Sequence, residues 1–193
     1  MANKVLVLEM DSAPDQITFA DFAGDFNPTA ANDLRHASAV DTEVQLTLAA
    51  VADGAARQST KVDLGSLRTR EYHVRAAFEM AATPVAGDVI ELYWAPSQHV
   101  TAANGNAGGA SGADGAYAGY AANLAAAVLQ LIYIGPFICT ADTTATVQVA
   151  EVGIFSPPER YGSLIVKNES AAAFHADDVE CHVVFDPIIP EIQ

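Results

Sequence analysis

Apolar and polar residues alternate along much of the chain, which is the spacing of a β-strand with one buried face. In residues 70–80 the apolar positions are Tyr72, Val74, Ala76, Phe78 and Met80. The same pattern returns in residues 88–94, where the apolar positions are Ile90, Leu92 and Trp94. The intervening "TPVAGD" (residues 83–88) supplies Pro and Gly for a turn, so the two strands are predicted to pair antiparallel.

Further short strands follow from the same pattern. Residues 44–48, 62–64 and 179–185 alternate, whereas 161–168 are apolar on both faces, as expected of a central strand. In residues 146–155 the alternation changes phase between Val149 and Ala150, which predicts a β-bulge. Many short strands separated by turn residues predict an all-β fold, an antiparallel β-sandwich of jelly-roll-like form. The predicted core comprises Tyr72, Val74, Phe78, Ile90, Leu92, Trp94, Leu164, Val166, Cys181, Val183 and Phe185.

A length of 193 residues fits one domain with a sizeable core. Residues 1–42 are predicted to hold a strand at Val5 to Glu9 followed by an irregular arm. Residues 43–193 form the sandwich domain, interrupted by a loop insertion at 97–120.

Charge excludes some classes of partner, because nine Lys and Arg stand against 24 Asp and Glu, a formal net charge of −15. No Lys or Arg occurs in residues 76–159, so a track for nucleic acid is not expected. A membrane span is not expected either, since the richest apolar stretch is broken at Gly135-Pro136. The apolar run near the N-terminus is too short for a signal peptide, and we expect assembly in a cytoplasm. Cys139 and Cys181 are predicted to be buried thiols.

Five of the nine basic residues fall in residues 57–75, namely Arg57, Lys61, Arg68, Arg70 and Arg75. One interpretation is a solvated strand-and-turn region. The other is a docking patch for an acidic neighbour, such as a second copy of the protein.

The stretch 97–131 contains one residue of the Asp, Glu, Lys and Arg types, Asp114, and is otherwise rich in Ala, Gly, Asn and Ser. Such a segment suits a loop that becomes ordered against an adjacent subunit, with Asn104, Asn106, Tyr117 and Tyr120 as contact residues. Two other interpretations remain: a flexible surface loop, or a short Ala-rich helix in 117–131 that packs on its own sandwich.

Motifs that carry catalysis are missing from the sequence, which has no GxGxxG, Walker lysine, HExxH, GxSxG or CxxC motif. Two tracts could in principle ligate a metal, one with Asp21, Asp25 and Asn27, and the other with His175, Asp177, Asp178, Glu180 and His182. The first lacks the spacing of a calcium loop, and strand periodicity places Glu180 and His182 on the solvent face. We therefore expect neither an enzyme nor a cofactor or metal site.

A resemblance to a known group of proteins covers residues 45–193. The "TPVAGD" connection, the exit "LYWAPS" into a variable loop, and the strand "YGSLIVKNES" near the end resemble structural proteins encoded in tailed-bacteriophage virion gene clusters. The resemblance implies a jelly-roll-like virion component that decorates a capsid shell or attaches to the tail.

Two functions follow from this resemblance. The first is a capsid decoration (cement) protein that staples neighbouring shell subunits through repeated contacts. Its partners would be the major capsid protein or other virion proteins, it would be a homotrimer at the capsid surface, and its subunit interface would use the five basic residues and four loop residues named above. The alternative is a carbohydrate-binding or host-attachment module that uses Tyr93, Trp94 and the loop tyrosines as stacking platforms.

Overall fold

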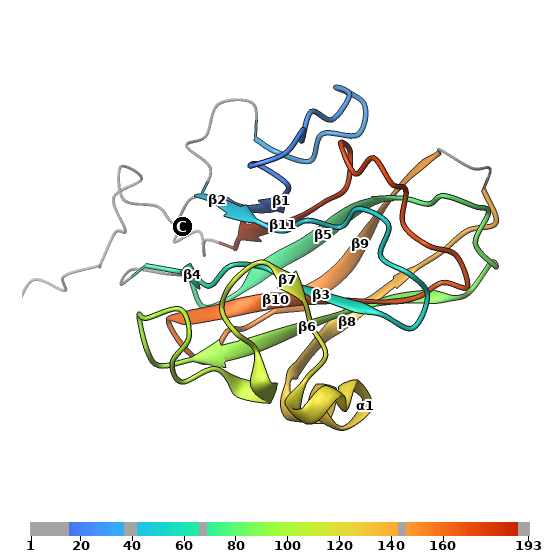
Figure 1. Ribbon diagram of the computed structural model, residues 1–193. Helices are drawn as coiled ribbons and strands as arrows, with labels where there is room; N and C mark the ends of the chain where they lie inside the picture. The colour runs from blue at the N-terminus through green and yellow to red at the C-terminus, as the bar shows by residue number, and fades with distance from the viewer. Residues whose placement is uncertain (1–15, 37–41, 66–68, 143–145, 189–193) are drawn as a thin grey trace, which may run out of the picture.

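Two β-sheets pack against each other in the computed structural model, which describes residues 16–36, 42–65, 69–142 and 146–188 (Figure 1). The first sheet has the order β2-β1-β11-β5-β9. Its strands are β1 (Ile17–Ala20), β2 (Thr42–Gln45), β5 (Tyr72–Glu79), β9 (Val147–Phe155) and β11 (His182–Pro187).

The second sheet has the order β7-β3-β10-β6-β8, and β4 also pairs with β10. Its strands are β3 (Ala56–Gln58), β4 (Val62–Asp63), β6 (Val89–Ser97), β7 (Gly115–Ala116), β8 (Ile132–Ile138) and β10 (Tyr161–Glu169). All helical segments are short: η2 (Ala107–Gly109), η3 (Tyr120–Ala122), α1 (Leu124–Ala127) and η4 (Val128–Gln130). No helix in these described ranges is long and apolar enough to cross a membrane.

The predicted all-β sandwich is confirmed. Strand pairs are antiparallel except for β1 and β2, which are parallel. β10 lies at the centre of its sheet, as the apolar character of both its faces predicts. Every residue of the predicted core is fully buried, and both cysteines are buried and free. Period-2 alternation therefore identified the inward faces of the long strands correctly.

The predicted pairing of residues 70–80 with 88–94 is wrong. β5 belongs to the first sheet and β6 to the second, so the chain crosses between the sheets in residues 80–88. The two sheets face each other across the core, where Phe78 of β5 packs edge-on against Phe137 of β8 with ring centroids 4.9 Å apart. The turn residues of "TPVAGD" thus shape a sheet-to-sheet connection and not a hairpin.

The N-terminal part also differs from expectation. Ile17–Ala20 form β1 inside the first sheet, between β2 and β11, where the sequence predicted an irregular arm. Residues 21–36, which we call the arm, are irregular as predicted. The strand expected at Val5 to Glu9 lies outside the described residues. The predicted bulge in β9 is present but lies at Val152, because Val74 pairs with Gly153 and Arg75 with Glu151.

Part of the outer face of each sheet is covered by a mostly irregular segment. The arm lies beside β1 and β11 of the first sheet, and the segment containing α1 lies on the opposite side of the molecule, next to β6 and β8 (Figure 1). We call residues 97–131 the loop module. These two covers hold several of the residues that the sequence marked as functional candidates, among them Asp21, Asp25, Tyr117 and Tyr120.

Candidate functional site

The loop module folds onto its own sheet and builds a second, small hydrophobic core there. The outward side chains of β6 and β10, Tyr93, Ala95 and Ile165, supply one wall of this core. Module residues supply the other wall: Ala110, Tyr117, Ala127 and Val128. The Ala-rich segment forms one turn of α-helix, and Asn123 caps it by accepting a hydrogen bond from Ala126 N at 3.1 Å. The interpretation that this segment packs on its own sandwich is therefore correct.

Tyr117 is the centre of the small core. Its ring is almost fully buried, and its hydroxyl donates a 2.5 Å hydrogen bond to the Gly108 carbonyl. Burial raises the pKa of Tyr117 to about 12. Gly108 has a positive φ of 62°, and a Cβ there would lie 2.7 Å from the Tyr117 hydroxyl. A glycine is thus required for this close approach. Tyr117 holds the module together and is not available to another subunit.

Lys61 anchors the beginning of the module. Its Nζ donates to Ser97 Oγ at 2.9 Å and lies 2.8–3.0 Å from the carbonyl oxygens of three module residues, His99, Thr101 and Asn104. Burial lowers the pKa of Lys61. An ammonium group has three N–H donors, so these four oxygens satisfy it entirely within the chain.

Asp114 is the single Asp, Glu, Lys or Arg residue in the module, and it anchors the second half of the module. Its carboxylate accepts hydrogen bonds from the backbone N–H and the hydroxyl of Thr47, at 3.0 and 2.8 Å. It also lies 3.7 Å from the Arg57 guanidinium. Its charge points inward, so the exposed surface of the module remains nearly uncharged.

Of the other three loop residues predicted for a subunit interface, one has its side chain inside the module and two have theirs at its surface. Asn106 donates from Nδ2 to the carbonyl oxygens of Ala102 and Ala110, both at 2.8 Å, and so shapes the module. The Asn104 side chain is exposed, and Tyr120 is 55% exposed. Of the four loop residues predicted for a subunit interface, Asn104 and Tyr120 present side chains to the surface.

The five basic residues do not form one patch in the part of the chain that the structure describes. Arg57 lies in the second sheet, beside Asp114. Arg75 lies on the outer face of the first sheet, where it pairs with Asp186 at 2.6 Å and reaches the Leu34 carbonyl at 3.2 Å. Arg70 is exposed, and Arg68 is outside the described residues. Arg57, Lys61 and Arg75 have partners within their own chain.

The arm is held on the first sheet by polar contacts. Glu180 accepts hydrogen bonds from Thr29 N at 3.2 Å and from the Asn32 side chain. His182 accepts one at Nε2 from Leu34 N, at 3.1 Å, and its Nδ1 lies 2.8 Å from the Glu180 carbonyl oxygen. Nδ1 must therefore carry the proton, and the imidazole is neutral. Burial lowers the pKa of His182.

The prediction that His182 faces solvent is wrong, because the side chain is fully buried. It does lie on the outward face of its strand, as periodicity indicates, but the arm covers that face. Phe26 packs against the imidazole with ring centroids 5.3 Å apart. Glu180 is half-buried for the same reason.

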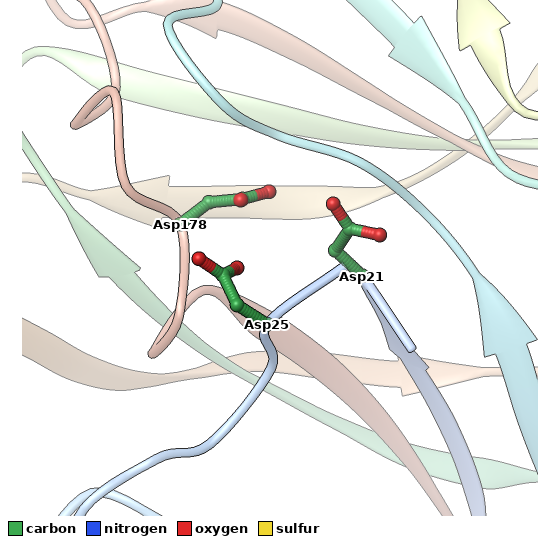
Figure 2. A group of neighbouring side chains, drawn as sticks. All are labelled: Asp21, Asp25 and Asp178. Carbon is green, nitrogen blue, oxygen red and sulfur yellow. The ribbon is translucent and has the colours of Figure 1, made fainter. Parts of the chain in front are cut away.

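Three carboxylates meet where the arm begins, two from the first tract considered for metal binding and one from the second. Asp21, Asp25 and Asp178 place carboxylate oxygens within 4.8 Å of one another (Figure 2). Oxygen ligands of this kind suit a hard cation such as Ca²⁺. However, Asp178 accepts a hydrogen bond from Leu48 N at 2.6 Å, and Asp21 accepts one from Gly24 N at 2.9 Å. Burial raises the pKa of Asp178. Backbone N–H groups of the chain itself thus partly compensate the negative charge of the three carboxylates.

Sequence reasoning missed this grouping because it treated the two tracts separately. The contact that joins them is a backbone hydrogen bond from Asn27 N to the Val179 carbonyl, 2.9 Å long. Because this bond joins two backbone groups, the side chains of Asn27 and Val179 give no indication of it in the sequence. The arm's irregular path brings the two tracts together.

The aromatic platforms proposed for a carbohydrate site are mostly inside the protein. Trp94 and Tyr117 are buried, and Tyr93 is 9% exposed. Tyr120 alone among these four presents a large part of its ring to solvent.

The two cysteines are buried as well, and burial raises the pKa of the Cys139 thiol to about 11. No family model, curated protein or solved structure matches this chain.

Proposed function

We propose that the protein is a structural component of a virion, a decoration protein that binds capsid shell subunits through the exposed surface of its loop module. The resemblance of residues 45–193 to tailed-phage structural proteins supports the setting. The observation that carries the proposal is the construction of the module: a long, nearly uncharged insertion that the chain locks in place with Lys61, Asp114 and Tyr117.

A preordered surface binds at a lower entropic cost than a loop that must order on contact. The module exposes large apolar side chains at Val100, Tyr120 and Leu129, with Leu129 83% exposed. A shell offers many equivalent sites, so modest contacts at each site are sufficient for stable decoration.

Charge also favours the module as the docking surface. The chain has a formal net charge of −15, so most of its surface repels an acidic partner. The single carboxylate of the module is turned toward Thr47 and Arg57. The module can therefore approach a partner with little electrostatic cost.

The virion itself provides the test. Particles are purified from phage carrying the unchanged gene, Leu129→Glu in the module, or Val85→Glu as a matched control in the 80–88 connection, where Val85 is 57% exposed. Mass spectrometry should find the unchanged chain and the control at a fixed copy number per particle. Leu129→Glu should reduce that number at least about tenfold, since 1.4 kcal/mol of lost binding energy per site is a factor of ten.

The possible results test the virion role and the docking surface separately. Absence of the unchanged chain from purified particles would overturn the virion role. Full occupancy by the Leu129→Glu chain would show that the module is not the docking surface.

A further inference from the structure

We propose that Asn104 is a self-modification site, at which the backbone nitrogen of Gly105 attacks the side-chain amide and converts the asparagine into a negatively charged residue. Lys61 and Ser97 assist this deamidation through hydrogen bonds to the carbonyl group that joins the two residues. The reaction itself is independent of the proposed docking role, whereas its consequence for shell binding rests on that role.

The sequence at Asn104 favours the reaction there over the other asparagines, because Asn104 is the one asparagine of the chain that precedes a glycine. Ring closure requires the backbone nitrogen of the next residue to reach the side-chain carbon of the asparagine. A side chain on that next residue hinders the approach and restricts the backbone, and glycine has none. The reacting atoms belong to adjacent residues, so they are held close together throughout.

The side chain of Asn104 is free to react. Residues 98–105 are all exposed to solvent, and no described residue hydrogen-bonds the Asn104 side-chain amide. The other two asparagines of the module are held in place. The Asn106 amide donates two hydrogen bonds to carbonyl oxygens of the module, and Asn123 caps α1. Those amides must break these bonds before they can turn toward a backbone nitrogen, and the Asn104 amide need not.

The backbone of Asn104, in contrast, is held by two donors. The Lys61 ammonium lies 2.8 Å from the Asn104 carbonyl oxygen, and Ser97 Oγ lies 3.0 Å from the same oxygen, both at hydrogen-bonding distance. This carbonyl belongs to the peptide group whose nitrogen, in Gly105, is the nucleophile. The donors therefore act directly on the reacting group.

These donors make the nucleophile easier to form. When the Gly105 N–H loses its proton, the negative charge is shared with the carbonyl oxygen, because nitrogen and oxygen of a peptide group are conjugated. A cation in hydrogen-bond contact with that oxygen stabilises the charge, as donors stabilise an oxyanion in an enzyme site. The folded chain thus presents a more reactive Asn–Gly pair than the same sequence without these contacts.

The reaction is balanced with water as the second reactant. Gly105 N gives its proton to solvent and forms a bond to Asn104 Cγ, while the side-chain nitrogen takes up a proton and leaves as ammonia. Water then adds to one carbonyl carbon of the resulting succinimide and breaks its C–N bond. Opening at Cγ leaves aspartate, and opening at the backbone carbonyl carbon leaves isoaspartate. Because Lys61 and Ser97 contact the backbone carbonyl oxygen, isoaspartate is the favoured product.

Either product adds a negative charge to a surface that is otherwise nearly uncharged. The single Asp, Glu, Lys or Arg residue of the module is Asp114, which is turned toward Thr47 and Arg57. Val100, one of the exposed apolar residues assigned to docking, lies in the same exposed stretch as Asn104. A carboxylate at this surface must lose water on contact with a partner, at a cost in binding. Docking therefore depends on the age of the chain.

Peptide mapping by mass spectrometry of the purified full-length chain, incubated in neutral buffer, tests the site. A synthetic peptide of residues 100–108 is the reference, since it carries the same Asn–Gly pair without Lys61 and Ser97. Conversion of the Asn104 amide to an acid should be about tenfold faster in the folded chain than in the peptide, as expected of one charge-assisted hydrogen bond. Asn106 and Asn123 should stay unmodified in the folded chain.

Variants of Lys61 separate its donor role from the flexibility of the loop. Lys61→Met removes the cation and also loosens the loop, but complete loosening brings the rate only to that of the peptide. This variant should therefore convert at the rate of the peptide or more slowly. Lys61→Arg keeps a cation and should retain most of the acceleration, and Arg70→Met, which changes an exposed cation elsewhere, should retain all of it.

Two results would overturn the proposal: slower conversion of Asn104 in the folded chain than in the peptide, or undiminished acceleration in Lys61→Met.

The copy number of the chain in purified particles tests the consequence for docking. Asn104→Asp should lower the copy number at least about threefold, because it introduces the charge in every chain. Asn104→Gln keeps a neutral amide that closes the ring far more slowly, and it should leave the copy number unchanged. Full occupancy by the Asn104→Asp chain would overturn the effect on docking. Conversion of Asn104 is measured on the isolated chain, so the modification site and the docking surface fail separately.

Discussion

The arm and the loop module perform the same structural task in different ways. Each covers the outer face of one sheet, and they lie on opposite sides of the sandwich (Figure 1). The module is attached through a small apolar core around Tyr117, together with the polar anchors Lys61 and Asp114. The arm is attached mainly through polar groups: Glu180 and His182 accept hydrogen bonds from it, and the Asp186 carboxylate lies 3.3 Å from the His36 imidazole.

This difference determines which conditions can detach the arm or the module from its sheet. Apolar burial does not depend on protonation and is little affected by salt. A buried neutral imidazole that must accept a hydrogen bond depends strongly on protonation. We therefore expect the module to stay attached under conditions that loosen the arm, and the following predictions test that contrast in order of decreasing effect.

Truncating Tyr117 should have the largest effect, because it removes the centre of the module's core. Tyr117→Ala should lower the free energy of unfolding by about 3–5 kcal/mol, as for other buried aromatic truncations. Tyr117→Phe keeps the ring and removes the hydroxyl bonded to Gly108, so it should cost about 1 kcal/mol. Urea denaturation measures both. A loss below 1 kcal/mol in Tyr117→Ala would mean that the small core does not hold the module.

Lys61→Met should have the next largest effect. It removes the cation that four oxygens surround and leaves the carbonyls of His99, Thr101 and Asn104 without their donor. Because the site is partly open to water, we expect a loss of roughly 2 kcal/mol. Hydrogen exchange should accelerate in residues 97–106 and not in the arm. Arg70→Met, which changes an exposed cation, is the control and should leave exchange unchanged.

The core of both sheets could be predicted from the sequence, whereas the covers could not. Alternation over several residues fixes which side of a strand is buried, and this placed Phe78, Leu92 and Trp94 correctly. It contains no information on which sheet a strand joins, so β5 and β6 were paired wrongly. Burial of His182 depends on Leu34, 148 positions away in an irregular segment. Periodicity cannot describe such a contact, because the arm has no period.

The candidate sites follow the same rule: local signals could be interpreted from the sequence, whereas contacts between distant segments could not. The sequence identified the loop module as unusual because its composition is unusual, and that signal is local. It placed Arg57 and Arg75 in one patch because they are close in sequence, but strands close in sequence can lie in different sheets.

Acidification should loosen the arm and spare the module. The pKa of His182 is lowered from 6.5 by burial, so the unfolded chain binds this proton more readily than the folded protein does. The stabilising contribution of neutral His182 is therefore complete above about pH 6.5 and is lost as the pH falls below that value. Protonated Nε2 would face the Leu34 N–H donor, with Asp33, Arg35 and Glu180 as the charged neighbours.

Hydrogen exchange of the Leu34 amide between pH 7.5 and 5, corrected for the intrinsic rate, measures this loosening. His182→Gln keeps an acceptor without a titrating proton and should remove most of the pH dependence. His36, His73 and His175 lie 3.3, 3.7 and 4.0 Å from the carboxylates of Asp186, Glu151 and Glu79, outside the contact between Leu34 and His182. Equal loss of protection in the arm and in residues 97–131 would contradict the contrast between the two covers.

The smallest expected effect concerns the acidic trio, in which Asp21 and Asp25 of the arm lie close to Asp178. Asp25 has an exposed side chain, and its charge lies close to those of Asp21 and Asp178 (Figure 2). Because like charges repel, Asp25→Asn should raise the unfolding temperature slightly in buffer with a chelator, by an amount equivalent to less than about 1 kcal/mol. The gain should shrink at high salt, since exposed charges are screened. Asp177→Asn removes an exposed carboxylate outside the trio and should change the unfolding temperature less. An unfolding temperature for Asp25→Asn below that of the unchanged chain would mean that repulsion in the trio does not limit the attachment of the arm.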